Sequence, residues 1–267
     1  MKKRFVFIAT AAALCLSFTG CGNTTSTPAT TETQEDFADN DFIKDLQKGL
    51  ESRWSIASDD VLSMTNDELK AYYEQSVNSE LDIIEKYQNE KFEDRKLQEV
   101  AIQYINLLKD SKEVIPYLST DMVKFSQDWD MIYKKRSQMI SSFHSDFGLT
   151  VSEKYESTLN DFISISNIVT QQESQKDTID NWVKSIVFEQ VDDSHGYQKY
   201  QATVENTTGF NFEYINLSIN LIDADGVVVQ TAYSSFQNIS AGAKVKFEFS
   251  TNTPFSSTDV TANYQVK

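Results

Sequence analysis

The chain has 267 residues, of which 40 are acidic and 24 are lysine or arginine, so its formal charge is −16. This acidity disfavours nucleic acids and anionic membrane surfaces as partners, because like charges repel. With only two cysteines, at positions 15 and 21, the fold must depend on a hydrophobic core rather than on a disulfide framework.

Residues 1–20 have the pattern of an export signal. A basic start, Lys2 to Arg4, precedes an apolar stretch from Phe5 to Phe18 and then Thr19-Gly20-Cys21. This order is typical of a signal peptide with a small-residue cleavage site, and it resembles the lipobox of bacterial lipoproteins. The apolar stretch is shorter than the ~20 residues that span a bilayer. We therefore predict a signal peptide over residues 1–20 and lipid attachment at Cys21.

Cleavage before Cys21 would remove three positive charges and Cys15, leaving a mature charge of −19 and a single cysteine. We expect no disulfide in that form. Secretion without a lipid is the alternative, since Phe18 stands where the lipobox more often has leucine. Residues 21–37 are rich in threonine and lack an apolar pattern, which predicts a flexible linker.

Residues 38–183 show the apolar period of helices. The expected buried stripes contain Phe42, Leu46, Leu50 and Trp54; Leu69, Tyr73, Val77, Leu81 and Ile84; Leu97, Ala101, Tyr104 and Leu108; Met122, Phe125, Trp129, Ile132, Met139 and Phe143; and Tyr155, Leu159, Phe162, Ser166 and Val169. Five helices with short connections predict an antiparallel helical bundle.

Several boundaries of these helices are marked by residue type. Thr-x-x-Glu runs at 65–68 and 150–153 predict capping boxes, in which each side chain bonds the other residue's backbone N–H. We expect the third helix to stop before Pro116, and the fourth to begin near Ser119 and end at Gly148.

From about residue 184 the apolar period becomes two, which indicates strands. The alternating residues are Tyr200, Ala202 and Val204; Ile215, Leu217, Ile219 and Leu221; Val227 to Val229; Val245, Phe247 and Phe249; and Val260, Ala262, Tyr264 and Val266. Six or seven short strands predict a two-sheet antiparallel sandwich over residues 184–267, with Leu217, Ile219, Leu221 and Phe247 inside. This segment has a net charge of −4, against −15 for residues 21–183.

Three short runs in the strand region carry a resemblance to a known family. They are Ile219-Asn220-Leu221-Ile222-Asp223 with Asp225-Gly226 after it, Val204-Glu205-Asn206-Thr207-Thr208, and Ala241-Gly242-Ala243-Lys244. The first resembles the signature of the FxLYD domain, with Ile219 for the usual Phe and Ile222 for the usual Tyr. The other two match that module's V-x-N-x-[ST] strand end and x-G-x-K turn.

The resemblance implies an immunoglobulin-like sandwich in a lipoprotein of a Gram-positive bacterium, and it implies no catalytic activity. Residues 49–54 are similar to the helical region that precedes this domain in clostridial lipoproteins. This match is weaker than that of the strand region. The expected fold class is therefore multi-domain α + β: a helical domain over 38–183, then an FxLYD-like immunoglobulin-type β-sandwich over 184–267.

The residues that could bind a metal are better explained by structural roles. Asp223, Asp225 and Gly226 echo the start of a calcium loop, but no glutamate follows at the twelfth position, so we interpret them as turn formers. His144 and His195 have no partner at metal-ligand spacing. We expect no metal and no cofactor.

Catalytic motifs are also missing from the sequence. The acidic pair Asp59-Asp60 is compatible with glycosidic chemistry, but such pairs arise readily among forty acids. Of the tryptophans, Trp54 and Trp129 are expected in the core and Trp182 at the domain junction. No catalytic residue is predicted.

We therefore expect a lipid-anchored, extracytoplasmic and non-enzymatic interaction or structural module with a protein partner at the cell envelope. An envelope enzyme, for example one acting on glycans through a site that motifs do not reveal, is the alternative.

Overall fold

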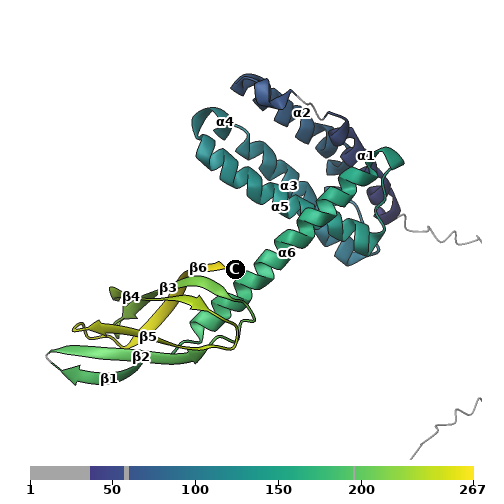
Figure 1. Cartoon of the computed structure of the whole chain (residues 1–267). Helices are drawn as coiled ribbons and strands as arrows, with labels where there is room; N and C mark the ends of the chain where they lie inside the picture. Colours follow the sequence, from purple (N-terminus) through teal and green to yellow (C-terminus); the bar gives the residue numbers. More distant parts are fainter. Residues whose placement is uncertain (1–36, 57–59, 195) are drawn as a thin grey trace, which may run out of the picture. The chain divides into compact units, whose positions relative to one another are not determined.

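The computed structural model describes residues 37–56, 60–194 and 196–267, and Phe37–Lys267 form one compact unit. Helices occupy the first part of the chain and strands the second, so the fold is mixed α + β (Figure 1). The predicted signal peptide, Cys21 and nearly all of the predicted linker lie outside the described residues. No described helix is both long enough and apolar enough to cross a membrane.

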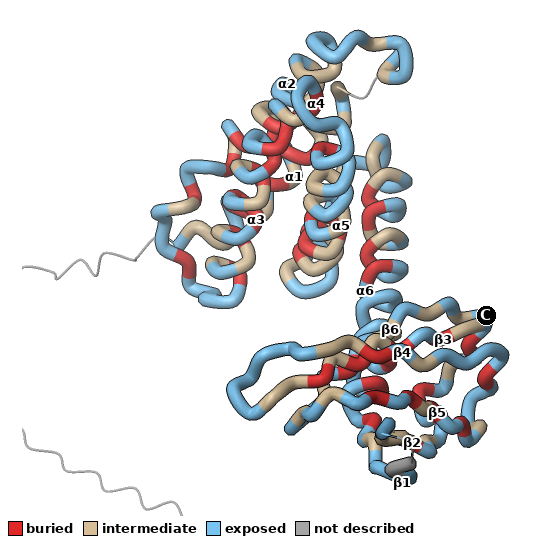
Figure 2. The backbone as a smooth tube through the Cα atoms, turned by 90° about the vertical axis from the view of Figure 1, so that its left-hand side faces the viewer, coloured by how far each residue is buried: buried red, intermediate tan, exposed pale blue. Residues whose placement is uncertain are grey.

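The helical part consists of α1 (Asp39–Ser55), α2 (Asn66–Ile84), α3 (Arg95–Val114), α4 (Tyr117–Thr120), α5 (Met122–Phe147) and α6 (Glu156–Lys184), with 3-10 turns η1 (Val61–Ser63), η2 (Glu85–Asn89) and η3 (Glu153–Tyr155). One hydrophobic cluster joins them, centred on Phe42, Tyr104 and Phe143. These rings pack at tilted or edge-on angles, with centroids 5.4 to 5.6 Å apart, a favourable geometry for aromatic pairs. Buried residues follow the inward faces of the helices (Figure 2).

Some helix boundaries agree with the sequence patterns. At α2 the Thr65 hydroxyl accepts from the Glu68 backbone N–H, while Glu68 Oε2 accepts from the Thr65 backbone N–H at 2.7 Å, which confirms the first capping box. Helix α3 ends two residues before Pro116. Helix α5 ends at Gly148, whose φ of 72° is the left-handed conformation that glycine adopts most readily.

Two boundary predictions are wrong. No capping box forms between Thr150 and Glu153, because Ser152 is extended and its N–H donates to Glu51 Oε1 of α1 at 2.7 Å, which delays the start of α6 to Glu156. Helix α5 starts at Met122 after the separate short α4, with Asp121 as its cap. Met122 therefore lies in the first turn and is 49% exposed, so it does not belong to the buried stripe.

The second part contains six strands in two antiparallel three-stranded sheets. Strands β1 (Glu189–Ser194), β2 (Tyr197–Glu205) and β5 (Lys244–Thr251) form one sheet, in that order. Strands β4 (Val228–Ile239), β3 (Phe212–Ile222) and β6 (Ser257–Val266) form the other. Both sheets contribute to one hydrophobic cluster, in which Leu217, Ile219, Leu221 and Phe247 are fully buried as predicted.

Two strands differ from the sequence expectation. The alternating apolar pattern begins only at Tyr200, but the acidic segment Glu189–Ser194 is the edge strand β1, whose pairing with β2 needs no apolar alternation. Strand β4 extends ten residues beyond Val229, through a polar segment that pairs with β3 across its whole length. Pairing with a neighbouring strand, rather than the local apolar pattern, determines where both strands form.

Helix α6 contributes to both clusters. Leu159 and Phe162 belong to the helical cluster, whereas Ile179, Trp182 and Val183 belong to the strand cluster. The Trp182 ring is stacked on Phe212 with centroids 5.8 Å apart, and its Nε1–H donates to the Glu205 carbonyl at 2.9 Å. The last turns of α6 are therefore part of the core beneath the sheets.

Candidate interaction site

The residues that the sequence singled out for chemistry do not come together in the structure. His144 is exposed at the end of α5, with Nδ1 2.8 Å from the Leu149 carbonyl oxygen. Asp223 Oδ1 accepts from the N–H groups of Asp225 and Val227, both at 2.9 Å, which confirms the role of turn former. Asp59 and His195 lie outside the described residues.

Among the described residues, no group of three or more His, Cys, Asp or Glu is placed to hold a metal ion. Trp54 and Trp129 are half-buried against the helical cluster rather than inside it. Trp129 packs on Tyr73 with ring centroids 4.6 Å apart. The predicted core role of these two indoles is therefore only partly correct.

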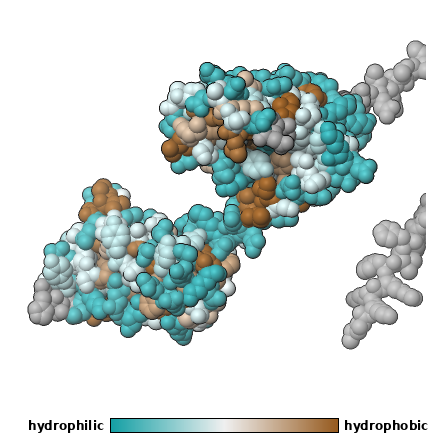
Figure 3. Space-filling model, turned by 45° about the horizontal axis from the view of Figure 1, so that its top comes forward, coloured by the Kyte–Doolittle hydropathy of each residue, from teal (hydrophilic) through white to brown (hydrophobic). Residues whose placement is uncertain are grey.

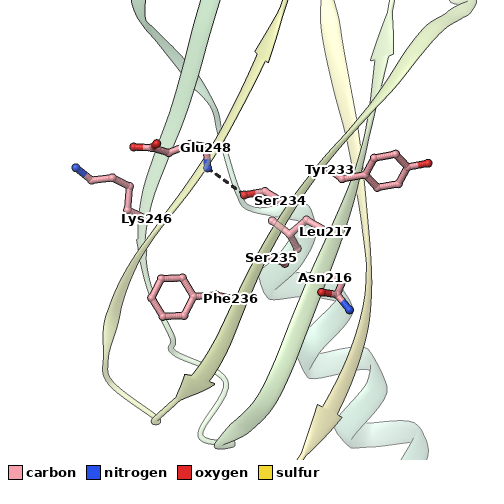
Figure 4. A pocket seen from close by; sticks show the side chains of 8 residues that line it. All are labelled: Asn216, Leu217, Tyr233, Ser234, Ser235, Phe236, Lys246 and Glu248. Atoms are coloured by element: carbon pink, nitrogen blue, oxygen red, sulfur yellow. Dashed lines mark hydrogen bonds between the residues drawn. The ribbon is translucent and has the colours of Figure 1, made fainter.

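A concave surface of the strand part lies along β4 and the facing part of β5. It is an open groove of about 670 Å³, lined by Asn216, Leu217, Tyr233, Ser234, Ser235, Phe236, Lys246 and Glu248. Figure 4 shows Phe236 pointing toward β5 and Tyr233 pointing the other way. The groove thus combines one aromatic wall with a lysine, a glutamate and small hydroxyl groups.

Alternation along β4 produces this arrangement. Ser234 and Phe236 face the side of the core, where Phe236 packs edge-on against Phe247 with centroids 6.4 Å apart. Tyr233 and Ser235 face the opposite side, across from Ser218 and Asn216 of β3. Tyr233 is 72% exposed and Phe236 39%, so both aromatic rings are available for contact.

A hydrogen bond joins the two sheets within the groove. The backbone N–H of Glu248 donates to Ser234 Oγ at 3.0 Å, shown as the dashed line in Figure 4. Glu248 also pairs with Lys199 of β2, with Nζ and Oε2 2.8 Å apart. This pairing lowers the pKa of the Glu248 carboxyl, mainly through the hydrogen bond from Lys199. The glutamate is therefore ionised at neutral pH.

A second polar cluster is buried in the helical part, and the sequence patterns did not reveal it. Glu80 on α2 is 0% exposed, and its Oε2 lies 2.8 Å from Arg136 Nη2 and 3.2 Å from Arg53 Nη1. The Tyr104 hydroxyl donates to Oε1. Gly49 lets α1 approach here, because a Cβ at that position would meet Glu80 Cγ at 3.3 Å. The cluster ties four helices together.

Electrostatics keep this cluster charged. Burial alone raises the pKa of Glu80, but Arg136 and Arg53 outweigh it, so the carboxyl pKa falls below its ordinary value. Burial and then the neighbouring carboxylate raise the pKa of the Tyr104 hydroxyl, despite the opposing effect of Arg136. Arg136 also lies over the Phe162 ring, 5.0 Å from its centroid. The pKa values of Arg136 and Tyr104 are both raised, so each is held in the protonated form that binds Glu80, whereas burial lowers the pKa of Arg53. The cluster is a structural arrangement.

No family model, curated protein or solved structure matches this chain.

Two of the three runs that carry the sequence resemblance meet in space. Asn206 is 1% exposed, and its Nδ2 donates to the carbonyls of Phe210 at 2.8 Å and Ser240 at 3.1 Å. Its backbone pairs with the 241–244 turn, where the Gly242 N–H donates to the Asn206 carbonyl at 2.8 Å. The buried asparagine therefore fastens the loop after β2 to the turn before β5.

Proposed function

We propose that this chain is an extracytoplasmic lipoprotein, tethered to the cell membrane by acylated Cys21, that acts as a non-enzymatic interaction module at the cell envelope. The basic start, the apolar stretch and Thr19-Gly20-Cys21 support the tether. Residues 21–37 are the proposed linker between membrane and folded unit.

We also propose that the strand part is an immunoglobulin-like sandwich of the FxLYD type. Three features support this: two antiparallel sheets with a shared core, the asparagine of the V-x-N-x-[ST] run buried beneath the x-G-x-K turn, and the Asp223 turn after the strand that carries the signature. Fold likeness alone assigns no activity, so the function is argued from the surface.

The groove beside β4 carries the proposal of a protein partner. It places two exposed aromatic rings, small hydroxyl groups and a lysine on the less acidic part of the chain. Aromatic residues are also enriched at protein interfaces.

The tether is tested by expressing the chain and its Cys21→Ala variant in a Gram-positive host and separating membrane from medium. We expect the unaltered chain in the membrane fraction and the variant in the soluble fraction. Equal membrane retention of both would mean that something other than this cysteine holds the protein.

The partner is tested by crosslinking on intact cells followed by mass spectrometry, with the soluble unit added as competitor. We expect crosslinked protein, reduced by the competitor. Recovery of no protein, together with binding of the chain to a wall polyanion at low salt, would contradict the proposal. The variant Tyr233→Ser serves to map contact to the groove, with exposed Tyr197→Ser on β2 as the matched control.

A further inference from the structure

The strand register defines which residues form the outer face of the β4-β3-β6 sheet. Residues directly opposite each other in neighbouring strands point to the same side, and so do alternate residues of one strand. Leu217 and Ile219 of β3 are buried on the inner side, so the residues between them and their partners point outward. We call these twelve outward positions the neutral face: Tyr214, Asn216, Ser218 and Asn220 of β3, Thr231, Tyr233, Ser235 and Gln237 of β4, and Asp259, Thr261, Asn263 and Gln265 of β6.

The neutral face is rich in side chains that form hydrogen bonds without carrying charge. Five of its residues have amide groups, four have aliphatic hydroxyl groups and two are tyrosines, which leaves Asp259 as its one charged residue. The outer face of the other sheet is different, because five of the eight outward positions on β2 and β5 are charged: Lys199, Glu205, Lys244, Lys246 and Glu248. Solvent exposure alone therefore does not explain why one face is nearly free of charge.

The polar groups of this face are directed to solvent and are largely unused. Tyr233 is 72% exposed, and Figure 4 shows Tyr233 and Asn216 on the side of β4 away from Phe236. Among the described side chains of the face, one hydrogen bond forms, from Thr231 Oγ1 to Asn220 Oδ1 at 2.8 Å. The other amide and hydroxyl groups are therefore available to a ligand.

We infer that the neutral face binds an uncharged glycan. Amide and hydroxyl groups both donate and accept hydrogen bonds, which matches the hydroxyl groups of a sugar chain. The rings of Tyr214 and Tyr233 supply flat apolar surfaces next to these polar groups, and the C–H face of a sugar ring can stack on such a surface. This inference goes beyond the proposed function, because it adds a ligand class and a binding face to the protein interaction proposed for the groove.

Charge and hydropathy favour a neutral glycan over the other ligands of a cell envelope. A polyanion needs lysine or arginine at its contact, and the neutral face has neither. The centre of a protein interface is typically apolar and rich in arginine and large aromatic residues, whereas the neutral face has no aliphatic side chain. Figure 3 shows that apolar residues occupy only small areas of the strand part on the visible side.

The shape of the neutral face suits an extended ligand. Its twelve positions form four rows of three side chains, which cover about 20 Å along the strands and about 10 Å across them. A linear sugar chain can lie along these rows and meet several amides in turn. Because the face is flat, it encloses less of its ligand than a closed pocket does, so each contact is expected to be weak.

The test titrates hexasaccharides into the chain from Gly22 onward, which keeps the compact unit Phe37–Lys267. Isothermal titration calorimetry is expected to show binding of a neutral hexamer, of N-acetylglucosamine or of glucose, with a dissociation constant below about 1 mM. The anionic hexamer of galacturonic acid is not expected to bind. Raising sodium chloride from about 0.05 to about 0.5 M should change the affinity by less than about twofold, because no charges meet in this contact.

Three variants locate the binding on the chain. Tyr214→Ser and Asn263→Ala change residues that lie on the neutral face and do not line the groove. Each is expected to weaken binding of the neutral hexamer about threefold to tenfold, through the loss of a ring or of a hydrogen bond. Gln201→Ala removes an amide from the outer face of the other sheet and is expected to leave the affinity unchanged. Circular dichroism verifies that all three variants fold.

The outcomes separate this inference from the proposed function. Binding of neither neutral hexamer, equal effects of the three variants, or a large loss of affinity at high salt overturns the inference. If crosslinking on cells finds a protein partner while neither hexamer binds, the proposed protein interaction stands and only the glycan is wrong. Glycan binding that depends on the neutral face, with no crosslinked protein, supports the inference and contradicts the protein partner.

Discussion

Asn206 holds together the loops that connect the two sheets. Its side chain donates to two carbonyls, and its Oδ1 accepts from the Thr208 hydroxyl at 2.7 Å and the Thr208 N–H at 3.2 Å. Leaving buried partners without a bond costs about 1–3 kcal/mol for each group. The contribution of this residue therefore exceeds that of a typical surface amide.

We predict that Asn206→Ala lowers the free energy of unfolding by about 2–4 kcal/mol, because the carbonyls of Phe210 and Ser240 lose their buried donor and Thr208 loses its acceptor. Urea unfolding followed by circular dichroism measures it. Thr207→Ala, at the exposed neighbouring position, is the control and is expected to change stability by less than about 0.5 kcal/mol. Equal effects would mean that the asparagine bonds contribute little.

Glu80 is the residue on which the buried charges of the helical part converge. Glu80→Gln leaves Arg53 and Arg136 buried without their carboxylate, and we predict a loss of about 3–5 kcal/mol. Glu74→Gln on the same helix breaks an exposed pair with Lys70 and should cost no more than about 0.5 kcal/mol. Chemical denaturation compares the two, and a small effect at Glu80 would show that the arginines find water or other acceptors.

A pH dependence is expected at Asp45. Burial raises its pKa, but hydrogen bonds from Lys48, Lys86 and Tyr87 outweigh burial and lower it well below the ordinary 3.8. As pH falls, the unfolded state takes up the proton first, so the stabilisation is present above about pH 4 and is lost below it.

We therefore predict that Asp45→Asn reduces stability by about 1–2 kcal/mol at pH 7 and that the difference from the unaltered chain narrows toward pH 3. Unfolding midpoints across this pH range measure it. Asp41→Asn, an exposed position on the same helix, is the control. A difference that widens on acidification would contradict the assigned pKa direction.

At the scale of elements, β3 sets the register of its sheet. Leu221 is fully buried, whereas Asn220 on the other face only accepts a hydrogen bond from Thr231 Oγ1 at 2.8 Å. We predict that Leu221→Ala costs about 2–5 kcal/mol through the cavity it leaves, and Asn220→Ala about 1 kcal/mol or less. Denaturant midpoints in the reverse order would place the register one residue away.

Helix starts show how tertiary contacts override local signals. Thr65 and Glu68, which are both exposed, form their capping box with each other. Near residue 150 the same motif fails, since Glu51 of α1 takes the Ser152 N–H and holds the backbone extended. The two sites have threonine and glutamate at the same spacing, and the second is held by a hydrogen bond to another helix.

At the scale of the whole molecule, the last turns of α6 pack into the core of the strand part. Its 29 residues include Ile179, Trp182 and Val183, which complete the strand cluster. Residues 170–178 between the two buried stretches are almost entirely exposed. The boundary expected near residue 184 therefore marks the change of apolar period in the sequence. It does not divide the two hydrophobic clusters, because the last turns of α6 belong to the strand cluster.

This packing predicts a difference between two fragments. Residues 172–267 retain the last turns of α6 and are expected to fold more stably than residues 184–267, by at least the ~3–5 kcal/mol typical of deleting a buried tryptophan. Trp182→Ala in the longer fragment is expected to give most of this difference. Urea midpoints by circular dichroism measure it, and equal midpoints would show that the sheets need no helix.

Local periodicity was sufficient to predict the long helices, the strands β2, β3, β5 and β6, and the buried side chains of β3, because these depend on neighbours two to four positions apart. It did not reveal the Glu80 cluster, whose partner Arg136 is 56 residues away, or the length of β4, which pairing with β3 defines. The groove likewise arises only where β4 and β5 meet. Burial, ion pairing and edge exposure depend on contacts between distant segments, and only the tertiary structure brings those segments together.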